Sequence, residues 1–497
     1  MTHVVDLGDE QLPPTWRLRH PGTDGTVSSQ TTELGNRVHV SGQKHELVGH
    51  LTTLLSQAKE IAVVCSFLLA QSNLEKAILN AAKRGVRVYI MVASEARLAN
   101  DSDQDFDKMV RQKHEDLLKT LAGHVLVRSA EHFHAKVLLV DPHDNKAAQG
   151  VLLTANLTDA ALTRNEELAV KLTNAEVQAV AALTGWAMWE TAEHELTVDG
   201  RFRTTKELNS LQHPSNHPSL FATTPESQDL RGQVLDLINR AQGTLWVSSF
   251  GWDENHPLVK RLCERAREGL EIKVLTRVRQ SAMPALVALC EAGAEVVGFK
   301  WLHAKAIYSN GEGIVMSANF QKHGMDNGFE LGVLLTQQDA HELEQRLRTW
   351  HANSTWILAS NPRLSDLVGD VQIWDDGRLR KAVVQQDKEV DRGEYKIQSL
   401  EHLEDDKPKL PQPNLDGDTL VHRTTYCWIN VAPVLASKAK ELYKDEDGEE
   451  PYSPRVFQER KTKNKVIVVE AKGDIPAAIE LKHDISAKAI VLAREAS

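Results

Sequence analysis

Two short segments of the sequence carry the same ionisable side chains in the same order. A histidine and a lysine two residues apart occur at His134 and Lys136, and again at His303 and Lys305. Residues two apart in a β-strand point to the same face, so each histidine is expected to project beside its lysine. A neutral imidazole is a nucleophile and a proton carrier, and a lysine attracts phosphate oxygens. Two such sets would let one imidazole attack a phosphorus atom while the other protonates the leaving oxygen.

An asparagine and a glutamate follow each histidine–lysine pair. Asn156 and Asn319 end small-residue turns, and Glu167 and Glu330 come eleven residues after them. An asparagine amide can donate to a phosphate oxygen. A carboxylate can accept a hydrogen bond from the far ring nitrogen of a histidine and so fix its tautomer. The lysines and asparagines would then stabilise the charge of the transition state, without a metal ion or other cofactor.

The repeat extends well beyond these residues. The sequence IAVVCSF at 61–67 corresponds to GTLWVSSF at 243–250. Gly85 and Gly269 each stand between a basic helical segment and an apolar strand, where glycine is the expected helix terminator. Short Val/Ile/Leu-rich strands alternate with helices in both copies, which predicts an α/β fold with two pseudo-symmetric lobes that face each other.

The lobes account for only part of the chain. We place the first lobe at 45–195 and the second at 228–369, which leaves an N-terminal extension at 1–44, a linker at 196–227 and a C-terminal accessory domain at 370–497. The linker is rich in Pro, Ser and His. Segments such as VQIWDDGRL, YCWINVAPVL and KVIVVEAKGD predict a β or α+β appendage, which could bind a partner protein. The acidic run DEDGEE beginning at Asp445 is interpreted as a solvated loop.

The bulk composition narrows the classes of protein. The net charge of −11 argues against a broad basic surface, although it allows a local basic cleft. No stretch approaches about 18 uninterrupted apolar residues, so no integral membrane association is expected. The N-terminus does not look like a secretion signal. The four cysteines form no CxxC pair, which indicates reduced thiols and a cytoplasmic protein.

This pattern resembles the phospholipase D superfamily of phosphodiesterases, whose signature is HxKx4D, then a small-residue turn with Asn and often a downstream acid. Asp141 completes the signature in the first copy, whereas Asn310 stands at that position in the second. The resemblance implies mixed sheets flanked by helices and a mainly structural role for the Asp. It also implies that His134 becomes the phosphohistidine and that His303 acts as general acid. A chain that carries both copies needs no second subunit to complete one active site.

Three further residues could bind substrate. Arg277 and Arg279 follow an apolar strand, and the carboxyl ends of strands in α/β sheets face the ligand crevice, so these arginines could hold flanking phosphates. Trp301 lies two residues before His303 and could stack a nucleobase. The alternatives are a solvated loop for the arginines and packing at the cleft rim for the tryptophan. His132 and His134 have the spacing of a metal pair, but no third ligand is evident, so no metal site is predicted.

The catalytic residues do not name the substrate. Cardiolipin-type synthases generally carry membrane-spanning segments and secreted phospholipases carry a signal sequence, and neither is evident in this sequence. The leading hypothesis is therefore a nuclease or nucleic-acid-processing phosphodiesterase that acts on DNA or RNA. The alternatives are a soluble phospholipase or phosphatidyl transferase, and a catalytically silent scaffold. The intact second set of His, Lys, Asn and Glu argues against the scaffold.

Overall fold

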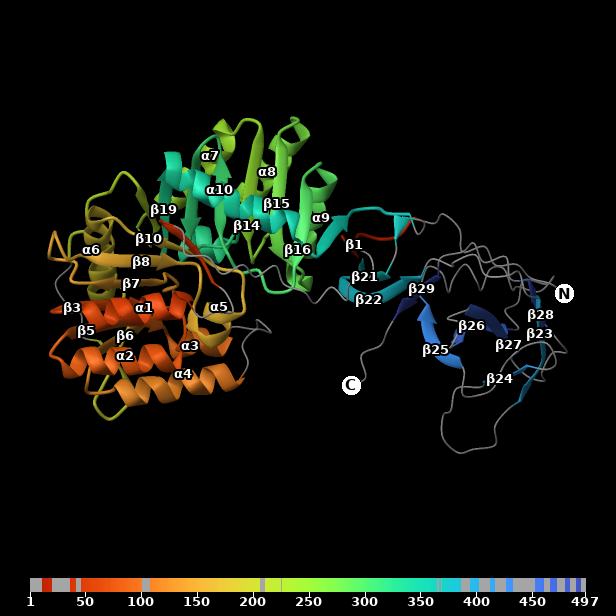
Figure 1. Ribbon diagram of the computed structural model, residues 1–497, viewed down its shortest axis with the longest axis horizontal. Coiled ribbons are helices and arrows are strands. Elements are labelled where there is room, and N and C mark those ends of the chain that lie inside the picture. The colour runs from red at the N-terminus through yellow and green to blue at the C-terminus, as the bar shows by residue number, and fades with distance from the viewer. Residues whose placement is uncertain are drawn as a thin grey trace. The chain divides into compact units, whose positions relative to one another are not determined.

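The computed structural model describes residues 11–19, 36–41, 46–100, 108–205, 211–224, 226–363, 366–367 and 369–385, and beyond these the strands at 394–401, 412–415, 426–431, 452–459, 465–471, 479–482 and 489–492. The chain divides into two compact units. One is Thr26–Ile357, and the other combines Met1–Gly25 with Leu358–Ser497. The eight residues predicted to be catalytic all lie in the unit Thr26–Ile357, which contains the first predicted lobe and most of the second (Figure 1).

The first lobe is built on a nine-stranded mixed sheet. Its strand order is β12-β11-β6-β5-β3-β7-β8-β10-β2. Strands β3, β5 and β6 are parallel neighbours, whereas β7, β8 and β10 run antiparallel to one another. The strands span β2 (Val38–Val40), β3 (Ile61–Cys65), β5 (Arg87–Ala93), β6 (Leu126–Ala130), β7 (Val137–Val140), β8 (Gln149–Leu153), β10 (Leu168–Lys171), β11 (His194–Leu196) and β12 (Phe202–Thr204).

The second lobe repeats this plan. Its strand order is β13-β19-β18-β17-β14-β15-β16-β20, with β14, β15 and β16 parallel and β17, β18 and β19 antiparallel. The predicted α/β fold with two pseudo-symmetric lobes and mixed sheets is therefore confirmed. The strands span β13 (Leu220–Thr223), β14 (Thr244–Ser249), β15 (Glu271–Arg277), β16 (Glu295–Phe299), β17 (Ala306–Ser309), β18 (Glu312–Met316), β19 (Glu330–Thr336) and β20 (Trp356–Ala359).

The segments outside the two predicted lobes contribute strands to these sheets. β2 lies in the predicted N-terminal extension and pairs with β10. The predicted linker supplies β12, which pairs with β11, and β13, which pairs with β19. The predicted N-terminal extension and linker thus add strands to the sheets of both lobes.

The helices of each lobe have separate packing partners. In the first lobe α1, α2 and α4 pack on the outer face of the sheet and share a buried apolar core with it (Figure 1). α6 and α10 instead contribute to the core between the lobes. The larger helices span α1 (Glu46–Gln57), α2 (Ser72–Lys83), α4 (Lys108–Leu121), α6 (Asn174–Glu190), α7 (Asp229–Arg240), α8 (Pro257–Arg267), α9 (Met283–Glu291) and α10 (Gln337–Ala352).

Local sequence signals explain where several helices begin and end. Gly85 and Gly269 follow α2 and α8 with φ of 92° and 94°, a left-handed conformation in which only glycine is free of steric cost. The predicted terminators are thus confirmed. α6 begins at a capping box, in which the Thr173 hydroxyl accepts from the Glu176 N–H and the Glu176 carboxylate accepts from the Thr173 N–H.

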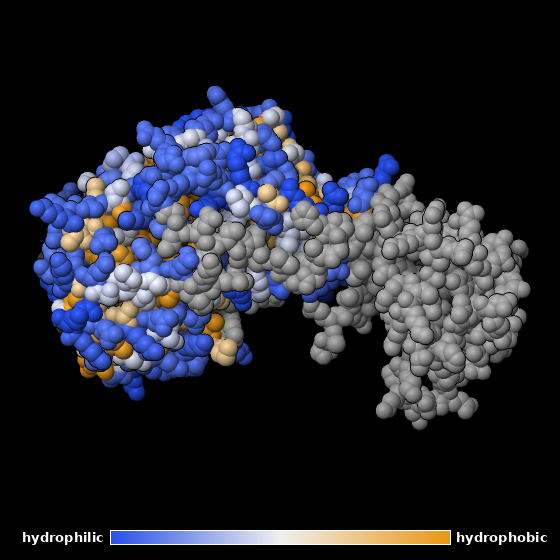
Figure 2. All heavy atoms as spheres, viewed as in Figure 1, coloured by the Kyte–Doolittle hydropathy of each residue, from blue (hydrophilic) through white to orange (hydrophobic). Residues whose placement is uncertain are grey.

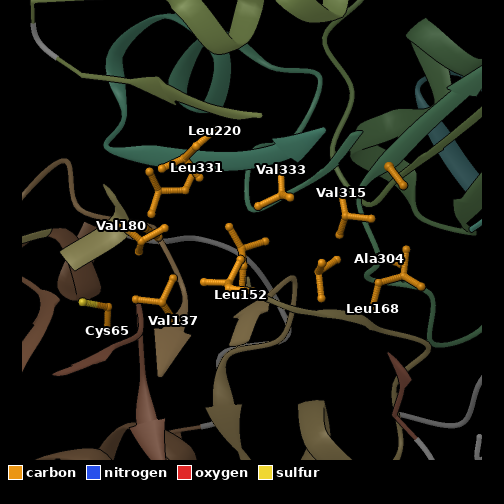
Figure 3. Packing of buried hydrophobic residues seen from close by; sticks show 14 of the residues in the cluster. Cys65, Val137, Leu152, Leu168, Val180, Leu220, Ala304, Val315, Leu331 and Val333 are labelled. Atoms are coloured by element: carbon orange, nitrogen blue, oxygen red, sulfur yellow. The ribbon is translucent and has the colours of Figure 1, made fainter. Parts of the chain in front are cut away.

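A single apolar core joins the two lobes. Side chains from β7 and β8 of the first lobe, among them Val137 and Leu152, pack in one cluster with Leu331 and Val333 of β19 (Figure 3). Each of these four side chains is fully buried. Burial of such side chains stabilises the folded state by about 1.5–3 kcal/mol each, so the two lobes are held in one fixed orientation.

The surface of this unit is mostly hydrophilic on the face shown in Figure 2. Large apolar side chains are exposed at only a few described positions, such as Met109 and Val198. Among the helices of the described residues, none combines the length and apolarity needed to cross a membrane.

The other unit is rich in strands. β1 (Thr15–Leu18) pairs antiparallel with β21 (Gly369–Asp375), which forms a hairpin with β22 (Arg378–Gln385). Asp376 and Gly377 both have positive φ at the hairpin turn, as the strand-matched two-residue turns require. The remaining strands are β23 (Glu394–Glu401), β24 (Gln412–Leu415), β25 (Tyr426–Val431), β26 (Tyr452–Glu459), β27 (Lys465–Ala471), β28 (Ile479–Lys482) and β29 (Ala489–Leu492). The acidic run at 445–450 lies outside the described residues.

Candidate active site

The two histidine–lysine segments lie at the junction of the lobes, just before the central strands β7 and β17. Each segment is held by backbone hydrogen bonds to the other lobe. His134 N–H donates to Phe329 O (3.1 Å), and His303 N–H donates to Glu166 O (3.0 Å). In return Phe329 N–H donates to His132 O, and Glu166 N–H donates to Trp301 O. Two parallel β-bridges result, one to Phe329 and one to Glu166. Glu330 follows Phe329 and Glu167 follows Glu166, so each histidine lies beside a glutamate of the opposite lobe.

The histidines and glutamates are exchanged between the lobes. His134 Nδ1 lies 2.7 Å from Glu330 Oε1, and His303 Nδ1 lies 2.8 Å from Glu167 Oε1. Both glutamates are fully buried, while the histidine side chains keep 14–15% of their surface exposed. Because Nδ1 of each ring faces a carboxylate, Nε2 is the nitrogen left to meet a substrate.

The second oxygen of each glutamate is held by a hydroxyl. Thr154 Oγ1 donates to Glu167 Oε2 (2.6 Å), and Ser317 Oγ donates to Glu330 Oε2. Thr154 and Ser317 begin the small-residue turns that end in the two asparagines. Sequence reasoning did not single out these hydroxyls. The available signal was that both turns begin with a hydroxyl residue, TAN in one copy and SAN in the other.

The two lysines are fully buried in the same region. Lys136 Nζ donates to the carbonyl of His134, and Lys305 Nζ donates to the carbonyl of His303. Lys305 Nζ also lies 2.9 Å from His303 Nδ1. Burial lowers the pKa of Lys136 to about 7, because desolvation outweighs the attraction of Glu330.

Burial and mutual charge set the protonation of the histidine–glutamate pairs. Desolvation lowers the pKa of both His134 and His303, and it outweighs the attraction of their carboxylates. Burial by itself would raise the pKa of Glu167 and of Glu330. The facing histidines and the hydroxyl donors, together with a neighbouring lysine, lower these pKa values below their ordinary range instead. The resting site therefore combines neutral imidazoles with ionised carboxylates.

The two asparagines end the turns that begin with Thr154 and Ser317, and their side chains are anchored differently. Asn319 Oδ1 accepts a hydrogen bond from Gly251 N–H (3.2 Å), which leaves its NH₂ group as the donor available to a ligand. Asn156 Oδ1 is buried and accepts no hydrogen bond from the described residues.

A phenylalanine packs against each histidine ring. The centroid of Phe67 lies 5.2 Å from that of His134, and the centroid of Phe250 lies 4.8 Å from that of His303. Both phenylalanines end the corresponding segments IAVVCSF and GTLWVSSF, so the repeat itself contained the signal for them. They form apolar walls that exclude water from one side of each imidazole.

The three predicted substrate-binding residues all lie near His303. Arg279 Cζ is 4.1 Å from the Phe250 centroid, and Arg277 Cζ is 4.9 Å from the Trp301 centroid. Arg164, which the sequence did not point to, lies over the same indole with Cζ 3.7 Å from its centroid. Trp301 is therefore already stacked with guanidinium groups, which argues against the predicted stacking on a nucleobase.

The HxKx4D position is structural in both lobes. Asp141 and Asn310 adopt left-handed conformations with φ of 47° and 54°, which Asp and Asn tolerate better than most residues. The Asp141 carboxylate accepts backbone N–H bonds from the start of β3, including Ile61 (3.0 Å). With its amide oriented to satisfy both groups, Asn310 bonds to the backbone N–H and carbonyl of Gln242.

His132 lies next to an imidazole of the second lobe, since its ring centroid is 5.9 Å from that of His323. Within the described part of the chain, no group of three or more His, Cys, Asp or Glu side chains is arranged to hold a metal ion.

Comparisons with known proteins agree with the duplication. Residues 51–189 and 234–351, together more than half of the chain, match the model of the family described as "Cardiolipin synthase, PLD-like domain". Among solved structures, the chain is similar to phosphatidylserine synthase from Haemophilus influenzae Rd KW20, at 11% identity and a TM-score of 0.47. That match covers 66% of this chain and 89% of the other.

Two smaller structures also match. They are the phospholipase D family member Nuc from Salmonella typhimurium (18% identity, TM-score 0.25, 28% of this chain and 98% of that chain) and NucT from Helicobacter pylori (17%, 0.25, 31% and 95%). No curated protein sequence matches the chain. Because the family model matches both lobes and over half of the chain, the protein belongs to the phospholipase D-like family of phosphodiester-processing enzymes.

Proposed function

We propose that the protein is a metal-independent phosphodiesterase that forms a phosphohistidine intermediate and acts on nucleic acid. The observation that carries this proposal is the exchange of histidine–glutamate pairs between the lobes. Each imidazole is held by a carboxylate of the opposite lobe, 2.7 Å away for His134 and 2.8 Å away for His303. The buried lysines supply the positive charge that a phosphoryl transition state requires.

The reaction takes place in two steps. In the first, His134 Nε2 attacks phosphorus and forms a P–N bond, while the bond from phosphorus to the leaving oxygen breaks and His303 Nε2–H protonates that oxygen. In the second, His303 takes a proton from water, the water oxygen attacks phosphorus, and the P–N bond breaks to release His134. The negative charge of a bound diester favours the protonated form of His303 that the first step uses.

A difference between the two histidines supports this assignment of roles. His134 Nδ1 is hydrogen-bonded to Glu330, so its proton is held on Nδ1 and Nε2 carries the lone pair. His303 Nδ1 lies as near to Lys305 Nζ (2.9 Å) as to Glu167 (2.8 Å). A lysine donor at Nδ1 favours the neutral tautomer with the proton on Nε2, which has no Nε2 lone pair with which to attack phosphorus. His303 is therefore the poorer nucleophile, and its imidazolium form offers Nε2–H to the leaving oxygen.

The arginines near His303 support nucleic acid as the substrate class. Arg277, Arg279 and Arg164 present fixed cationic groups close to one of the two imidazoles, and guanidinium groups suit phosphate geometry. The second candidate is a soluble phospholipase or phosphatidyl transferase. The description of the matching family, which names cardiolipin synthase, favours this candidate. In a transferase an alcohol takes the place of water in the second step.

We also propose a cytoplasmic protein whose C-terminal residues 370–497 bind a partner or select the substrate. Cys65 and Cys263 are free thiols. Burial raises the pKa of the Cys65 and Cys263 thiols, which keeps them protonated and unreactive. Such thiols fit a reducing compartment.

The test is an activity assay on the full-length protein in EDTA, without added metal. The substrates are labelled single-stranded DNA, duplex DNA, RNA and phosphatidylcholine vesicles, with and without glycerol as an acceptor alcohol. We expect cleavage of a nucleic acid, and loss of that cleavage in His134→Ala and in His303→Ala. His341→Ala, which replaces an exposed histidine of α10, should behave like the unchanged protein. Turnover of lipid alone, or activity that survives in either site variant, would overturn the proposal.

A further inference from the structure

The repeat makes it possible to compare the residues around His303 with those around His134, position by position. We call these two sets of residues the His303 flank and the His134 flank of the catalytic centre. Two of the positions are matched at the ends of β15 and β5, which have the same length. The other two are matched because they lie at the same spacing before the catalytic histidine or glutamate in each copy. At four such positions a basic residue near His303 corresponds to a non-basic residue of the other copy. The pairs are Arg277 and Ala93, Arg279 and Glu95, Lys300 and Glu131, and Arg164 and Asn327.

The His303 flank is a continuous stack of rings and cations. The Phe250 ring packs against His303, and Arg279 Cζ and Arg277 Cζ lie 4.1 and 5.6 Å from its centroid. Arg277 also lies 4.9 Å from the centroid of Trp301, which carries Arg164 at 3.7 Å. Lys300 Nζ lies 5.3 Å from the same indole. The aromatic faces hold these long side chains in place, so less conformational entropy is lost when an anion binds.

The His134 flank has glutamates at two of these four positions. Glu95 and Glu131 are exposed there, and Arg97, whose Cζ lies 5.9 Å from the Phe67 centroid, is the basic residue near that ring.

We infer that the surroundings of the catalytic centre are polarised, and that a second phosphate of the substrate binds beside His303, between Arg164, Arg277 and Arg279. Arg164 comes from the first lobe and the other two come from the second, so both lobes build this subsite. Trp301 is then a platform that positions Arg164 and Arg277. This inference rests on the proposed phosphodiesterase function. It adds that the substrate carries a phosphate next to the scissile one, on the leaving-group side if His303 is the acid.

Small synthetic substrates test the inference even though the natural substrate is not identified. The probes are TpT, which holds one phosphodiester, and the dinucleotides pTpT and TpTp, which add a terminal phosphate at one end or the other. We expect one of the two phosphorylated dinucleotides to exceed TpT in kcat/KM by about tenfold or more, because hydrogen bonds to a charged group are stronger than those between neutral groups. The preferred end would show which nucleoside occupies the His303 side.

Variants then locate the second phosphate. Arg279→Gln and Arg164→Gln should each remove most of the preference for the phosphorylated dinucleotide, and the loss should appear in KM. Glu95→Arg added to Arg279→Gln should not restore it, because the new charge lies at the corresponding position of the first lobe. Arg203→Gln, which replaces an exposed arginine of β12, serves as the matched control and should keep the full preference.

Two results overturn the inference. One is equal cleavage of TpT, pTpT and TpTp by the unchanged protein, and the other is a preference that survives in both arginine variants. Either result leaves the proposed function intact. The proposed function fails separately if the unchanged protein cleaves neither these dinucleotides nor bis(p-nitrophenyl) phosphate, an activated diester with no second phosphate. The two failures are therefore distinguishable.

Discussion

The two lobes share their catalytic side chains but differ in how those side chains are supported. In both, a histidine faces a buried glutamate of the opposite lobe, and a hydroxyl holds the second carboxylate oxygen. The asparagines differ, because Asn319 is anchored by Gly251 N–H and Asn156 Oδ1 accepts no bond from the described residues. The segment after the asparagine is the α-helix α5 (Asp159–Thr163) in the first lobe and a π-helical turn (His323–Asn327) in the second.

The side chains that react are the same in both lobes, whereas the groups that hold them in place differ. Two imidazoles that act on one phosphorus atom must each be oriented, so neither glutamate can be dispensed with. The supports need only hold those groups in place, and several local structures can do so. π-helical turns occur frequently at functional sites, and this one places Gly324 against Asn319 and Gly328 against Glu330.

The largest expected effect comes from the two glutamates. In Glu330→Gln the amide no longer stabilises the histidine tautomer that attacks phosphorus. The value of kcat should therefore fall by up to about ten-thousandfold for every diester, as when the orienting carboxylate of a catalytic triad is neutralised. Glu167→Gln should cost as much with a dinucleotide. With bis(p-nitrophenyl) phosphate it should cost far less, because p-nitrophenolate leaves without a proton. Rates on both substrates for both variants test the assignment of roles, and a reversed pattern would make His303 the nucleophile.

The buried lysines provide the next test. Lys136→Met should lower kcat/KM by about a hundredfold or more, as for loss of a transition-state donor. It should also change how stability depends on pH. The Lys136 pKa is about 7 in the folded protein and 10.5 as its ordinary value, so the unfolded chain binds the additional proton between these pH values. The free energy of unfolding of the unchanged protein should therefore rise from about pH 7 toward pH 10.

Urea unfolding at several pH values measures that rise directly. Lys136→Met has no proton to lose at this position, so its stability should be flatter with pH and higher than that of the unchanged protein at pH 7. Identical slopes for the two proteins would show that Lys136 is charged and well compensated when buried.

The sequence predicted the participants of this site but not their pairing. His134, His303 and both glutamates could be found in the sequence because each occupies a repeated position. The residue types themselves restrict which reactions such a set can carry out. Which glutamate faces which histidine depends on how two sheets pack across a shared core, and no local spacing encodes that arrangement. Arg164 was missed for the same reason, because it belongs to the first lobe in sequence and to the His303 flank in space.

Gly324 of the π-helical turn provides the next test, which applies to the second lobe only. A Cβ on Gly324 would lie 2.8 Å from the Asn319 carbonyl oxygen and 2.9 Å from the Asn319 nitrogen, both of which are backbone atoms. Gly324→Ala should therefore shift Asn319, lower kcat about tenfold and cost about 1–3 kcal/mol of stability. Gly232→Ala in α7 is the matched control, because its Cβ would meet nothing within 4 Å. It should stabilise the protein by about 0.5–1 kcal/mol and leave kcat unchanged.

The smallest expected effect concerns the HxKx4D position, where the lobes differ by Asp141 and Asn310. Asp141→Asn replaces an acceptor of three backbone N–H bonds by a group with one acceptor oxygen and one donor. It should cost about 1–2 kcal/mol of stability and leave kcat unchanged. Hydrogen bonds from the backbone of Ile61 and its neighbours outweigh burial and lower the Asp141 pKa. This contribution is thus complete above the ordinary pKa of an aspartate and is lost as the pH falls through the lower, folded value.

Asn310→Asp is the reciprocal change. It removes the amide donor that reaches the Gln242 carbonyl, so it should also destabilise the protein, although neither lobe gains or loses a catalytic group. Thermal unfolding of the two single variants and the double exchange measures this. If the position is structural in both lobes, the two costs should add, because the sites belong to separate sheets. A change in kcat with either variant would instead mean that the residue acts on the adjacent histidine–lysine segment.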